Sequence, residues 1–281
     1  MSTKAEREIS REVGLEVGSI LGKYFLKLDH LHYGYWGNGL EVDITNLHKA
    51  QDEYAKLVIS HIPDGVKSIL DVGCGTGHID KILIDKGYDV DCVSPSPYMN
   101  KHIRKLLGDK SHIFECNYEE IQTDKKYDMV MFCESFQYIN IEKALSNTNN
   151  LLKKNGYLLI CDIFKKDMKG KMSGGHKLYK FDAFIKDAPF ELLESLDITN
   201  ETAPNMDLMN DVLMNVVQPV IKAGVRLSES RHALVVKFLK WKYKKKINKL
   251  QQKYFADDKS GENFKKYKIY QLLLFQKEQK Q

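Results

Sequence analysis

The sequence predicts an α/β protein built on a doubly wound, mostly parallel sheet. From residue 67 onward, short apolar runs typical of strands alternate with helix-like segments. A glycine-rich turn, residues 73–77, follows the first run, and Gly87 and Gly108 stand where the next two helices should end. In a sheet of this kind, ligands bind at the carboxyl ends of the strands.

The elements follow in order from the apolar spacing and the turn residues. Two helices are expected before the sheet, over residues 4–29 and 46–61, with an aromatic and glycine-rich segment, residues 30–39, between them. The first five strands are expected near residues 67–72, 88–93, 111–116, 127–133 and 156–163. The helices between these strands are expected near residues 77–86, 97–107 and 141–153.

The chain changes character after residue 164. Residues 165–177 are polar and contain a Gly-Gly pair, so a mobile loop is expected there. A sixth strand is expected over residues 190–199, helices over 205–256 and a final strand over 267–275. These segments add two strands and a helical insert to the alternating core.

Composition narrows the class of protein. With 281 residues and 43% hydrophobic content, the chain can bury a sizeable core. The sequence contains no run of 18 apolar residues, so no membrane-spanning helix is expected. The charged N-terminus lacks the apolar stretch of a signal peptide. Five cysteines without paired spacing and nine scattered histidines predict reduced thiols, no metal site and a cytoplasmic location.

The positive charge is concentrated in one segment. The net charge is +5, but residues 237–253 hold eight lysines and no acid, which leaves the rest of the chain at −3. This distribution argues against a general nucleic-acid binder. Aromatic and aliphatic residues interleave with the lysines, so the segment predicts a helix at an anionic membrane surface, an RNA contact, or a lid helix with a solvated lysine face.

The glycine-rich turn reads Asp71-Val72-Gly73-Cys74-Gly75-Thr76-Gly77. It is not a dinucleotide-binding fingerprint, because the third glycine of that pattern would fall on His78. Strand, acid, glycines and helix together resemble the first motif of class I S-adenosylmethionine (SAM) dependent methyltransferases. The resemblance implies that Asp71 orders the loop and approaches the amino group of the methionine moiety. It also implies that Gly73, Cys74, Gly75 and Gly77 offer backbone contact to the cofactor.

The next two strand ends depart from this family. Ser94 stands where the family has an acid for the ribose hydroxyls, and Pro95 and Met99 flank it in the cofactor site that the resemblance implies. Asn117 stands where an Asp commonly accepts from the adenine amine, and its amide oxygen can do the same without charge. Tyr118 is expected to cover the adenine face.

The segment after the fourth strand, residues 132–139, lies beside the sulfonium and the substrate in the family. It lacks the Asn/Asp-Pro-Pro-Tyr/Phe signature of nucleobase amino methylation, which argues against an adenine-modifying enzyme. Cys133 and Glu134 are assigned to the cofactor site. The candidate catalytic residues are Glu134, Tyr138, His32 and His176, the last as a general base from the predicted loop.

The aromatic run His32-Tyr33-Gly34-Tyr35-Trp36 looks like the segment before the core of sterol, tocopherol, phosphoethanolamine and cyclopropane-fatty-acid type enzymes. There it folds over the methionine end of SAM. Aromatic faces suit a sulfonium through cation–π contact, so Tyr33, Tyr35 and Trp36 are expected at the cofactor. Another interpretation is a buried aromatic anchor that ties the segment to the core.

Together the motifs predict a seven-stranded Rossmann-like methyltransferase that converts SAM to S-adenosylhomocysteine. The expected division is a helical cap with the aromatic lid segment (1–61), the SAM-binding core (62–203), a helical substrate lid (204–257), and the last strand and tail (258–281). The expected acceptor is a small, apolar or lipid-like molecule, methylated on oxygen, nitrogen or carbon. The oligomeric state stays open.

Three other interpretations stay open. A macromolecular methyltransferase would hold RNA or protein through the lysine-rich segment. A non-catalytic SAM-binding scaffold or sensor is suggested because Ser94 and Asn117 replace expected acids. The sulfonium can also serve other chemistry, such as cyclisation or cyclopropanation.

Overall fold

The computed structural model describes residues 4–168, 172–254 and 259–278. The chain divides into two compact units, residues 1–202 with 267–281, and residues 203–266. The insert predicted over residues 204–257 falls within the second unit, and each unit is described by itself. Among the described residues, no helix combines the length and the apolar content that crossing a membrane requires.

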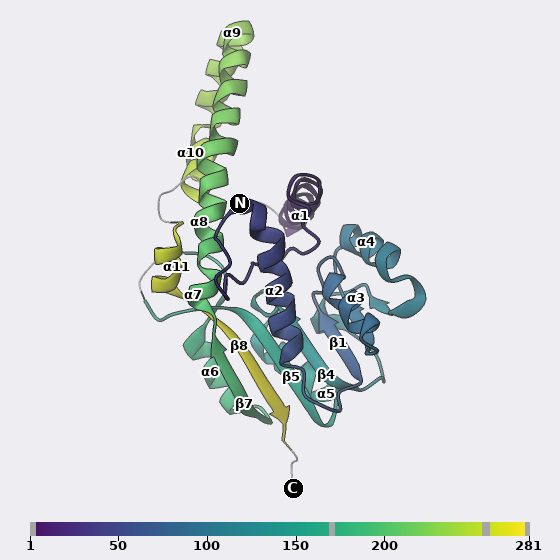
Figure 1. Ribbon diagram of the computed structural model, residues 1–281. Coiled ribbons are helices and arrows are strands. Elements are labelled where there is room, and N and C mark those ends of the chain that lie inside the picture. Colours follow the sequence, from purple (N-terminus) through teal and green to yellow (C-terminus); the bar gives the residue numbers. More distant parts are fainter. Residues whose placement is uncertain (1–3, 169–171, 255–258, 279–281) are drawn as a thin grey trace. The chain divides into compact units, whose positions relative to one another are not determined.

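The first unit is organised around one twisted sheet (Figure 1). Its strands are β1 (Ser68–Val72), β2 (Asp89–Val93), β3 (Ile113–Phe114), β4 (Tyr127–Cys133), β5 (Leu152–Lys165), β6 (His176–Lys177), β7 (Phe190–Asp197) and β8 (Lys268–Lys277). The order is β3-β2-β1-β4-β5-β8-β7, and β6 pairs with β5 off this path. The first five strands pair in parallel, while β8 runs antiparallel to β5 and β7, so the predicted doubly wound sheet is confirmed.

Helices cover both faces of this sheet, with α2 and α3 on one face and α5 and α6 on the other (Figure 1). The helices of this unit are α1 (Lys4–Leu26), α2 (Leu47–Ser60), α3 (His78–Asp85), α4 (Pro97–Leu107), α5 (Ile141–Leu151), α6 (Leu178–Lys186) and α7 (Thr199–Thr202). Single 3-10 turns are η1 (Ile44–Asn46), η2 (Gly108–Lys110), η3 (Tyr118–Glu120) and η4 (Phe136–Tyr138).

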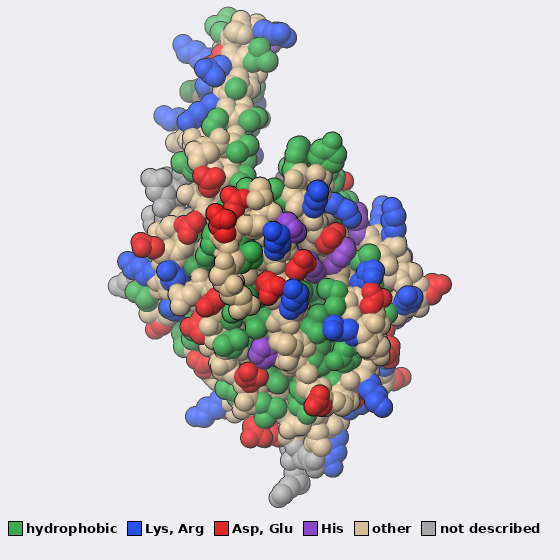
Figure 2. Space-filling view, in the orientation of Figure 1, with side chains coloured by type: hydrophobic (Ala, Val, Ile, Leu, Met, Phe, Trp, Pro, Cys, Tyr) green, Lys and Arg blue, Asp and Glu red, His purple; other side chains and the backbone are tan. Residues whose placement is uncertain are grey.

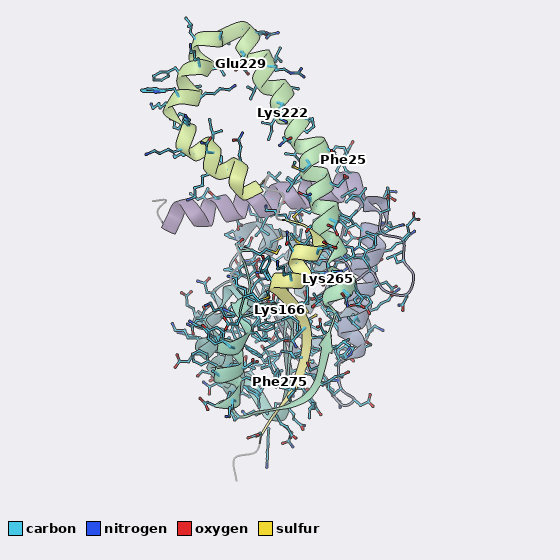
Figure 3. All side chains as sticks on the ribbon, turned by 90° about the vertical axis from the view of Figure 1, so that its left-hand side faces the viewer. Phe25, Lys166, Lys222, Glu229, Lys265 and Phe275 are labelled. Carbon is cyan, nitrogen blue, oxygen red and sulfur yellow. The ribbon has the colours of Figure 1, made fainter. Side chains whose placement is uncertain are left out.

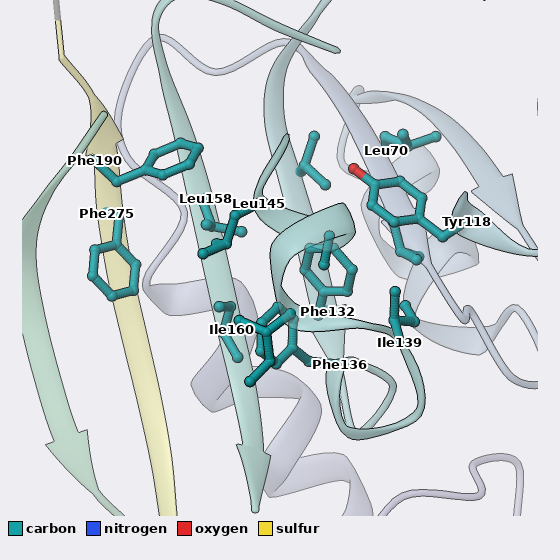
Figure 4. Close-up of a cluster of buried hydrophobic side chains, with 14 of the residues drawn as sticks. Leu70, Tyr118, Phe132, Phe136, Ile139, Leu145, Leu158, Ile160, Phe190 and Phe275 are labelled. Carbon is teal, nitrogen blue, oxygen red and sulfur yellow. The ribbon is translucent and has the colours of Figure 1, made fainter. Parts of the chain in front are cut away.

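A cluster of buried apolar side chains fills the space between the sheet and α5 and α6 (Figure 4). Phe136 meets Phe132 and Phe181 edge-on, with ring centroids 5.3 Å and 5.6 Å apart. Such edge-on aromatic pairs stabilise the fold beyond the contribution of the apolar area that they bury. Because Phe136 lies in η4, directly after β4, this packing fixes the loop that follows the fourth strand.

The helix α4 spans the predicted residues 97–107 because its ends are coded locally. The Ser96 hydroxyl accepts a hydrogen bond from Met99 N at 3.1 Å, and Pro97 takes the first helical position. At the other end, Gly108 has a positive φ of 57°. The cap and the stop signal were both visible in the sequence.

The region after β5 differs from the expected loop. The strand β5 continues to Lys165, and the described part of the segment is held by side chains: Gln137 accepts from Gly175 N at 3.0 Å, and Lys268 Nζ donates to Ser173 O at 2.8 Å. Residues 169–171 of the predicted loop lie outside the described residues. The helix α6 was not predicted, although Phe181 on it is buried in the core.

The second unit is helical, as predicted for its described part. It contains α8 (Pro204–Val212), a π-helical turn η5 (Leu213–Val217), α9 (Gln218–Lys242) and α10 (Lys244–Tyr254), and α11 (Gly261–Tyr267) leads out of it. The helix α9 is interrupted at His232, whose φ of −141° and ψ of 48° are not helical. Glu229 and Lys240 form an ion pair of 2.6 Å across this bend.

Candidate functional site

The glycine-rich loop connects β1 to α3 and presents bare backbone at the end of the first strand. Gly73 has a φ of 79°, and a Cβ there would collide with Ser135 Cβ, so only glycine fits. Gly75 has a φ of 58°, but a Cβ at this position would meet no atom within 4 Å. Gly75 therefore faces open space, and a ligand can approach its main chain.

A cavity of about 370 Å³ opens beside this loop, and all residues that line it belong to the first unit. It lies at the carboxyl ends of β1, β2 and β4, where a parallel sheet places its ligands. The predicted site residues that line it are His32, Asp71, Gly73, Cys74, Gly75, Ser94, Pro95, Met99, Asn117, Tyr118, Cys133, Glu134 and Tyr138.

The aromatic segment contacts the cavity through different residues than expected. Tyr33, Tyr35 and Trp36 do not line it, whereas His30, Leu31 and His32 do. The reason is the anchoring of the segment: Tyr35 N donates to Ala50 O at 2.8 Å, and Trp36 N donates to Glu201 O at 2.8 Å. The Trp36 side chain is 8% exposed, which fits the interpretation of a buried anchor.

Two further predicted residues lie outside the cavity lining. Gly77 precedes α3 with a φ of 80° and shapes the turn. His176 Nε2 lies 3.0 Å from Phe136 O and 2.9 Å from Ile139 O, so its proton is donated to these carbonyls. The sequence hypothesis of His176 as a general base is therefore not supported, because this histidine braces the loop after β4.

Other lining residues were missed by the sequence argument. Leu15 comes from α1, which is attached through Glu12: its Oε1 accepts from Ser96 Oγ at 2.8 Å and from Tyr98 N at 2.9 Å. The helix itself was predicted, but its partner at the start of α4 is not coded near residue 12. The remaining missed residues are His30, Leu31, Val72, Thr76, His78, Ile79, Val93, Ser96, Glu119, Ser135 and Ile139.

Glu134 is an acid of the cavity wall that its backbone and two hydrogen bonds hold in place. It follows β4 with a positive φ of 58°, which a side chain adopts only where its surroundings fix it. Its Oε1 accepts hydrogen bonds from Tyr33 N and from Tyr270 Oη, both at 2.7 Å. Burial raises the pKa of Glu134 to about 8, although both hydrogen bonds act in the opposite direction. This carboxyl therefore changes its protonation near neutral pH.

His32 offers a neutral acceptor. Its ring stacks on Tyr54 with centroids 4.3 Å apart, and burial lowers its pKa to about 3, with a further contribution from His30. Nδ1 lies 2.8 Å from Tyr33 O, and because a carbonyl only accepts, the ring proton is on Nδ1. Nε2 then carries a lone pair, is buried and has no hydrogen-bond partner.

Four buried groups gather beneath the glycine-rich loop, namely Asp71, Cys74, Asp80 and Cys92. Sequence analysis predicted no metal site, yet Cys74, Asp80 and Cys92 place their potential ligand atoms within 4.8 Å of one another, the one such trio among the described residues. Burial raises the pKa of Asp71 to about 7 and that of Asp80 well above its usual range. Asp80 therefore favours its neutral form when no ligand is bound.

Comparisons with known proteins agree with this geometry. Residues 70–160 match the family model described as "Methyltransferase domain". A malonyl-[acyl-carrier protein] O-methyltransferase of Ilyobacter polytropus is 29% identical over 213 residues, which cover 68% of this chain and 73% of the relative. A ubiquinone biosynthesis O-methyltransferase of Rickettsia felis is 29% identical, covering 52% of this chain and 63%, less than two thirds, of that relative.

The fold is shared with solved structures. A geranyl diphosphate C-methyltransferase from Streptomyces coelicolor, crystallised with geranyl diphosphate and S-adenosyl-L-homocysteine, superposes with a TM-score of 0.63 and 16% identity, and the match covers 98% of each chain. The glycine-rich loop lies within the matched residues, so the chain carries the methyltransferase domain of a SAM-dependent enzyme.

The chemistry of the cavity suits this cofactor. SAM carries an ammonium and a sulfonium, and the cavity wall offers the carboxyls of Asp71 and Glu134. Asp71 Oδ1 is buried without a hydrogen-bond partner, so it can accept from a ligand. Asn117, the residue expected at the adenine, donates from Nδ2 to Glu120 Oε2 at 3.1 Å, an orientation in which the amide oxygen is left to accept from an amine.

Proposed function

We propose that this enzyme transfers the methyl group of SAM to the oxygen of a small, lipid-like acceptor. The observation that carries the proposal is Glu134, a buried carboxyl on the cavity wall whose pKa is raised to about 8. A hydroxyl acceptor must lose a proton during methylation, whereas a neutral amine can attack without a base. A proton acceptor with a pKa near the working pH therefore favours an oxygen acceptor.

In this proposal the glycine-rich loop holds the cofactor. The backbone at Gly73 and Gly75 approaches it, Asp71 accepts from its ammonium, and the amide oxygen of Asn117 accepts from the adenine amine. Ser94 lines the same cavity and offers one hydroxyl to the ribose, without the bidentate geometry of an acid. Tyr118 supports the cavity wall, since its hydroxyl lies 2.9 Å from Thr148 Oγ1 and its ring packs on Phe132.

Bound SAM supplies an electrophilic methyl group on its sulfonium. The acceptor oxygen would bond to this methyl as the carbon–sulfur bond of SAM breaks, and the acceptor proton would pass to the Glu134 carboxylate. Tyr33 N and the Tyr270 hydroxyl hold this carboxylate in place. His32, with a pKa of about 3, is too weak a base for the proton, but Nε2 can accept a hydrogen bond that orients a ligand.

The expected acceptor class follows from the remaining wall. Leu15, Leu31, Tyr138 and Ile139 line the cavity with apolar surface, which suits an acceptor with an apolar body. The relatives named above carry the names of a malonyl-[acyl-carrier protein] and a ubiquinone biosynthesis O-methyltransferase. Phenols and alcohols with an apolar body are therefore the first acceptors to examine, because their hydroxyl carries the proton that Glu134 would take. A carboxylate on an acyl chain has no proton to lose and serves as the comparison.

The test is methyl transfer from radiolabelled SAM to phenol, carboxylate and amine acceptors by the wild type and by Glu134→Gln. Glutamine keeps an acceptor oxygen for both hydrogen bonds but cannot take a proton. We expect the turnover number for the preferred oxygen acceptor to fall by roughly 100-fold or more, while SAM still binds. Turnover only on amines, or an unchanged turnover number in Glu134→Gln, would overturn the proposal.

A further inference from the structure

The second unit exposes apolar side chains that its own packing does not use. In the part of α9 that follows the bend at His232, the side chains of Leu234, Phe238 and Trp241 are 83%, 53% and 73% exposed. Their spacing of four and three residues places them on one side of a helix. The rings of Phe238 and Trp241 lie 5.9 Å apart, so the exposed surface is continuous.

Lysines surround this apolar face. Seven lysines between residues 237 and 249 are exposed, and no acid occurs between Glu229 and Asp257. Lys242 Nζ lies 5.9 Å from the centre of the Phe238 ring, at the border of the apolar face. Residues 203–266 contain 14 basic and six acidic side chains, a net charge of +8 on a chain whose total is +5.

The bend in α9 folds the helix back on itself, so the apolar face and the lysines lie in one helical hairpin. Figure 3 shows the helix passing Lys222 and Glu229 and then turning back, and the Glu229–Lys240 ion pair of 2.6 Å joins its two arms. Figure 2 shows Lys and Arg side chains and hydrophobic side chains side by side over α9. The apolar face and the lysines therefore belong to one helical hairpin, which we call the α9–α10 hairpin, residues 218–254.

We propose that the α9–α10 hairpin binds the surface of a bilayer that contains anionic lipids, with Leu234, Phe238 and Trp241 entering the interface and the lysines contacting headgroups. An amphipathic helix with aromatic residues on one side and lysines around them has the composition of such a binding element. Tryptophan in particular favours the headgroup boundary, where its ring is apolar and its N–H can donate.

Two other occupants fit the same surface less well. Single-stranded RNA would use the lysines and the aromatic rings, but it would leave Leu234 and Leu239 exposed to water. Moving such apolar surface out of water into a bilayer is favourable by about 25 cal/mol for each Å² buried. A second copy of the hairpin would bury the apolar face, but it would bring two clusters of seven lysines together. An anionic bilayer satisfies both features at once.

The location of Trp241 allows a direct measurement. The chain has two tryptophans, and Trp36 is 8% exposed whereas Trp241 is 73% exposed. We expect the tryptophan emission to shift to shorter wavelength, and to be quenched by brominated acyl chains, when phosphatidylglycerol is present in phosphatidylcholine vesicles. Trp241→Phe should abolish the optical change and still sediment with these vesicles, because phenylalanine keeps an apolar ring.

Charge variants separate a lipid surface from a general adhesion. Lys242→Gln with Lys245→Gln should weaken the binding to anionic vesicles roughly 25-fold, about fivefold for each lysine. The matched control, Lys143→Gln with Lys154→Gln, removes two exposed lysines of the first unit and should leave the binding unchanged. Raising the salt concentration should weaken the binding of the wild type.

Three results would overturn the proposal. The first is no emission shift with phosphatidylglycerol vesicles. The second is equal loss of binding in the two lysine double variants, since a non-specific charge effect would explain it. The third is that single-stranded RNA displaces the protein from vesicles and the emission of Trp241 shows no lipid contact. That result would mean that the hairpin binds nucleic acid. All three are independent of methyl transfer.

Discussion

The hydroxyl of Tyr270 donates a hydrogen bond of 2.7 Å to Glu134 Oε1, and so joins β8 to the end of β4. The two residues are 136 positions apart in the sequence. Tyr270 Oη also lies 3.0 Å from Tyr54 Oη, whose own hydroxyl donates to Cys161 O. The acid of the cavity wall is therefore held by a tyrosine of the last strand, and Tyr54 of α2 lies beside that tyrosine without contacting the acid.

Tyr270→Phe should shift the pH profile of methyl transfer. The hydrogen bond from Tyr270 lowers the pKa of Glu134, so its removal raises that pKa further above about 8. We expect the rising limb of the turnover number to move to higher pH. A merely structural role would lower turnover without moving the limb, and Tyr54→Phe, which does not contact Glu134, is the control.

The affinity for SAM should rise with pH. Without ligand, the pKa of Asp71 is about 7 and that of Glu134 about 8, so at neutral pH both carboxyls are partly protonated. The cationic cofactor favours their ionised forms, and binding therefore releases protons. Calorimetry between pH 6 and 9 covers roughly one unit below the lower and one unit above the higher of these two pKa values. It should show that SAM binds more tightly at about pH 9 than at about pH 6.

S-adenosylhomocysteine provides the comparison for this pH dependence, because its sulfur is neutral. Its affinity should rise less with pH than that of SAM, and Glu134→Gln should bring the two dependences closer. An affinity for SAM that is constant or falls across this range would contradict the assigned carboxyls.

The ligand-free protein should lose stability as the pH rises. Burial raises the pKa of Asp71 and Asp162 from 3.8 to about 7, and that of Glu134 from 4.5 to about 8. Between the unfolded and folded values, the folded state binds more protons, so the free energy of unfolding decreases with pH. Urea denaturation at intervals from about pH 4 to about pH 8 measures this slope.

Asp80→Asn tests the same argument at one residue. The Asp80 carboxyl is buried beside Asp71 and Cys92, and burial raises its pKa, with further contributions from these two neighbours. An amide cannot ionise, so the variant should be more stable than the wild type at the upper end of the pH range and similar at the lower end. Equal destabilisation at both ends would indicate that the carboxyl is needed for packing.

Glu12→Gln should weaken cofactor binding through the attachment of α1. Oε1 of Glu12 accepts from Ser96 Oγ and Tyr98 N, and Leu15, one turn later, lines the cavity. Replacing the charged acceptor by an amide should cost about 1 kcal/mol, which corresponds to an approximately fivefold higher Kd for SAM. Glu16→Gln, on an exposed position of the same helix, is the matched control and should leave the Kd unchanged.

Much of the fold was predictable because its signals are local. The glycine-rich loop, the cap formed by Ser96 and the stop at Gly108 are coded within a few residues, and the structure places them as expected. The helix α6 was missed because its apolar residues, such as Phe181, follow a polar segment that was interpreted as one loop. Its packing partner Phe136 is far away in the sequence.

The site was predictable where a strand end defines it, and not where long-range contacts do. The carboxyl ends of β1, β2 and β4 bring Asp71, Ser94 and Glu134 to one cavity, as their strands required. The choice of His32 over Trp36 as a lining residue depends on a hydrogen bond to Glu201 O, which no local pattern encodes. The resemblance of the aromatic run therefore identified the segment but not its orientation.

The most direct test of the account is calorimetric titration of SAM into the wild type and into Gly75→Arg. A Cβ at Gly75 meets no atom within 4 Å, so an arginine there should point into open space and occupy the cofactor site. Circular dichroism verifies that the variant is folded. The account predicts binding to the wild type and none to folded Gly75→Arg, and equal binding to both, or to neither, would contradict it.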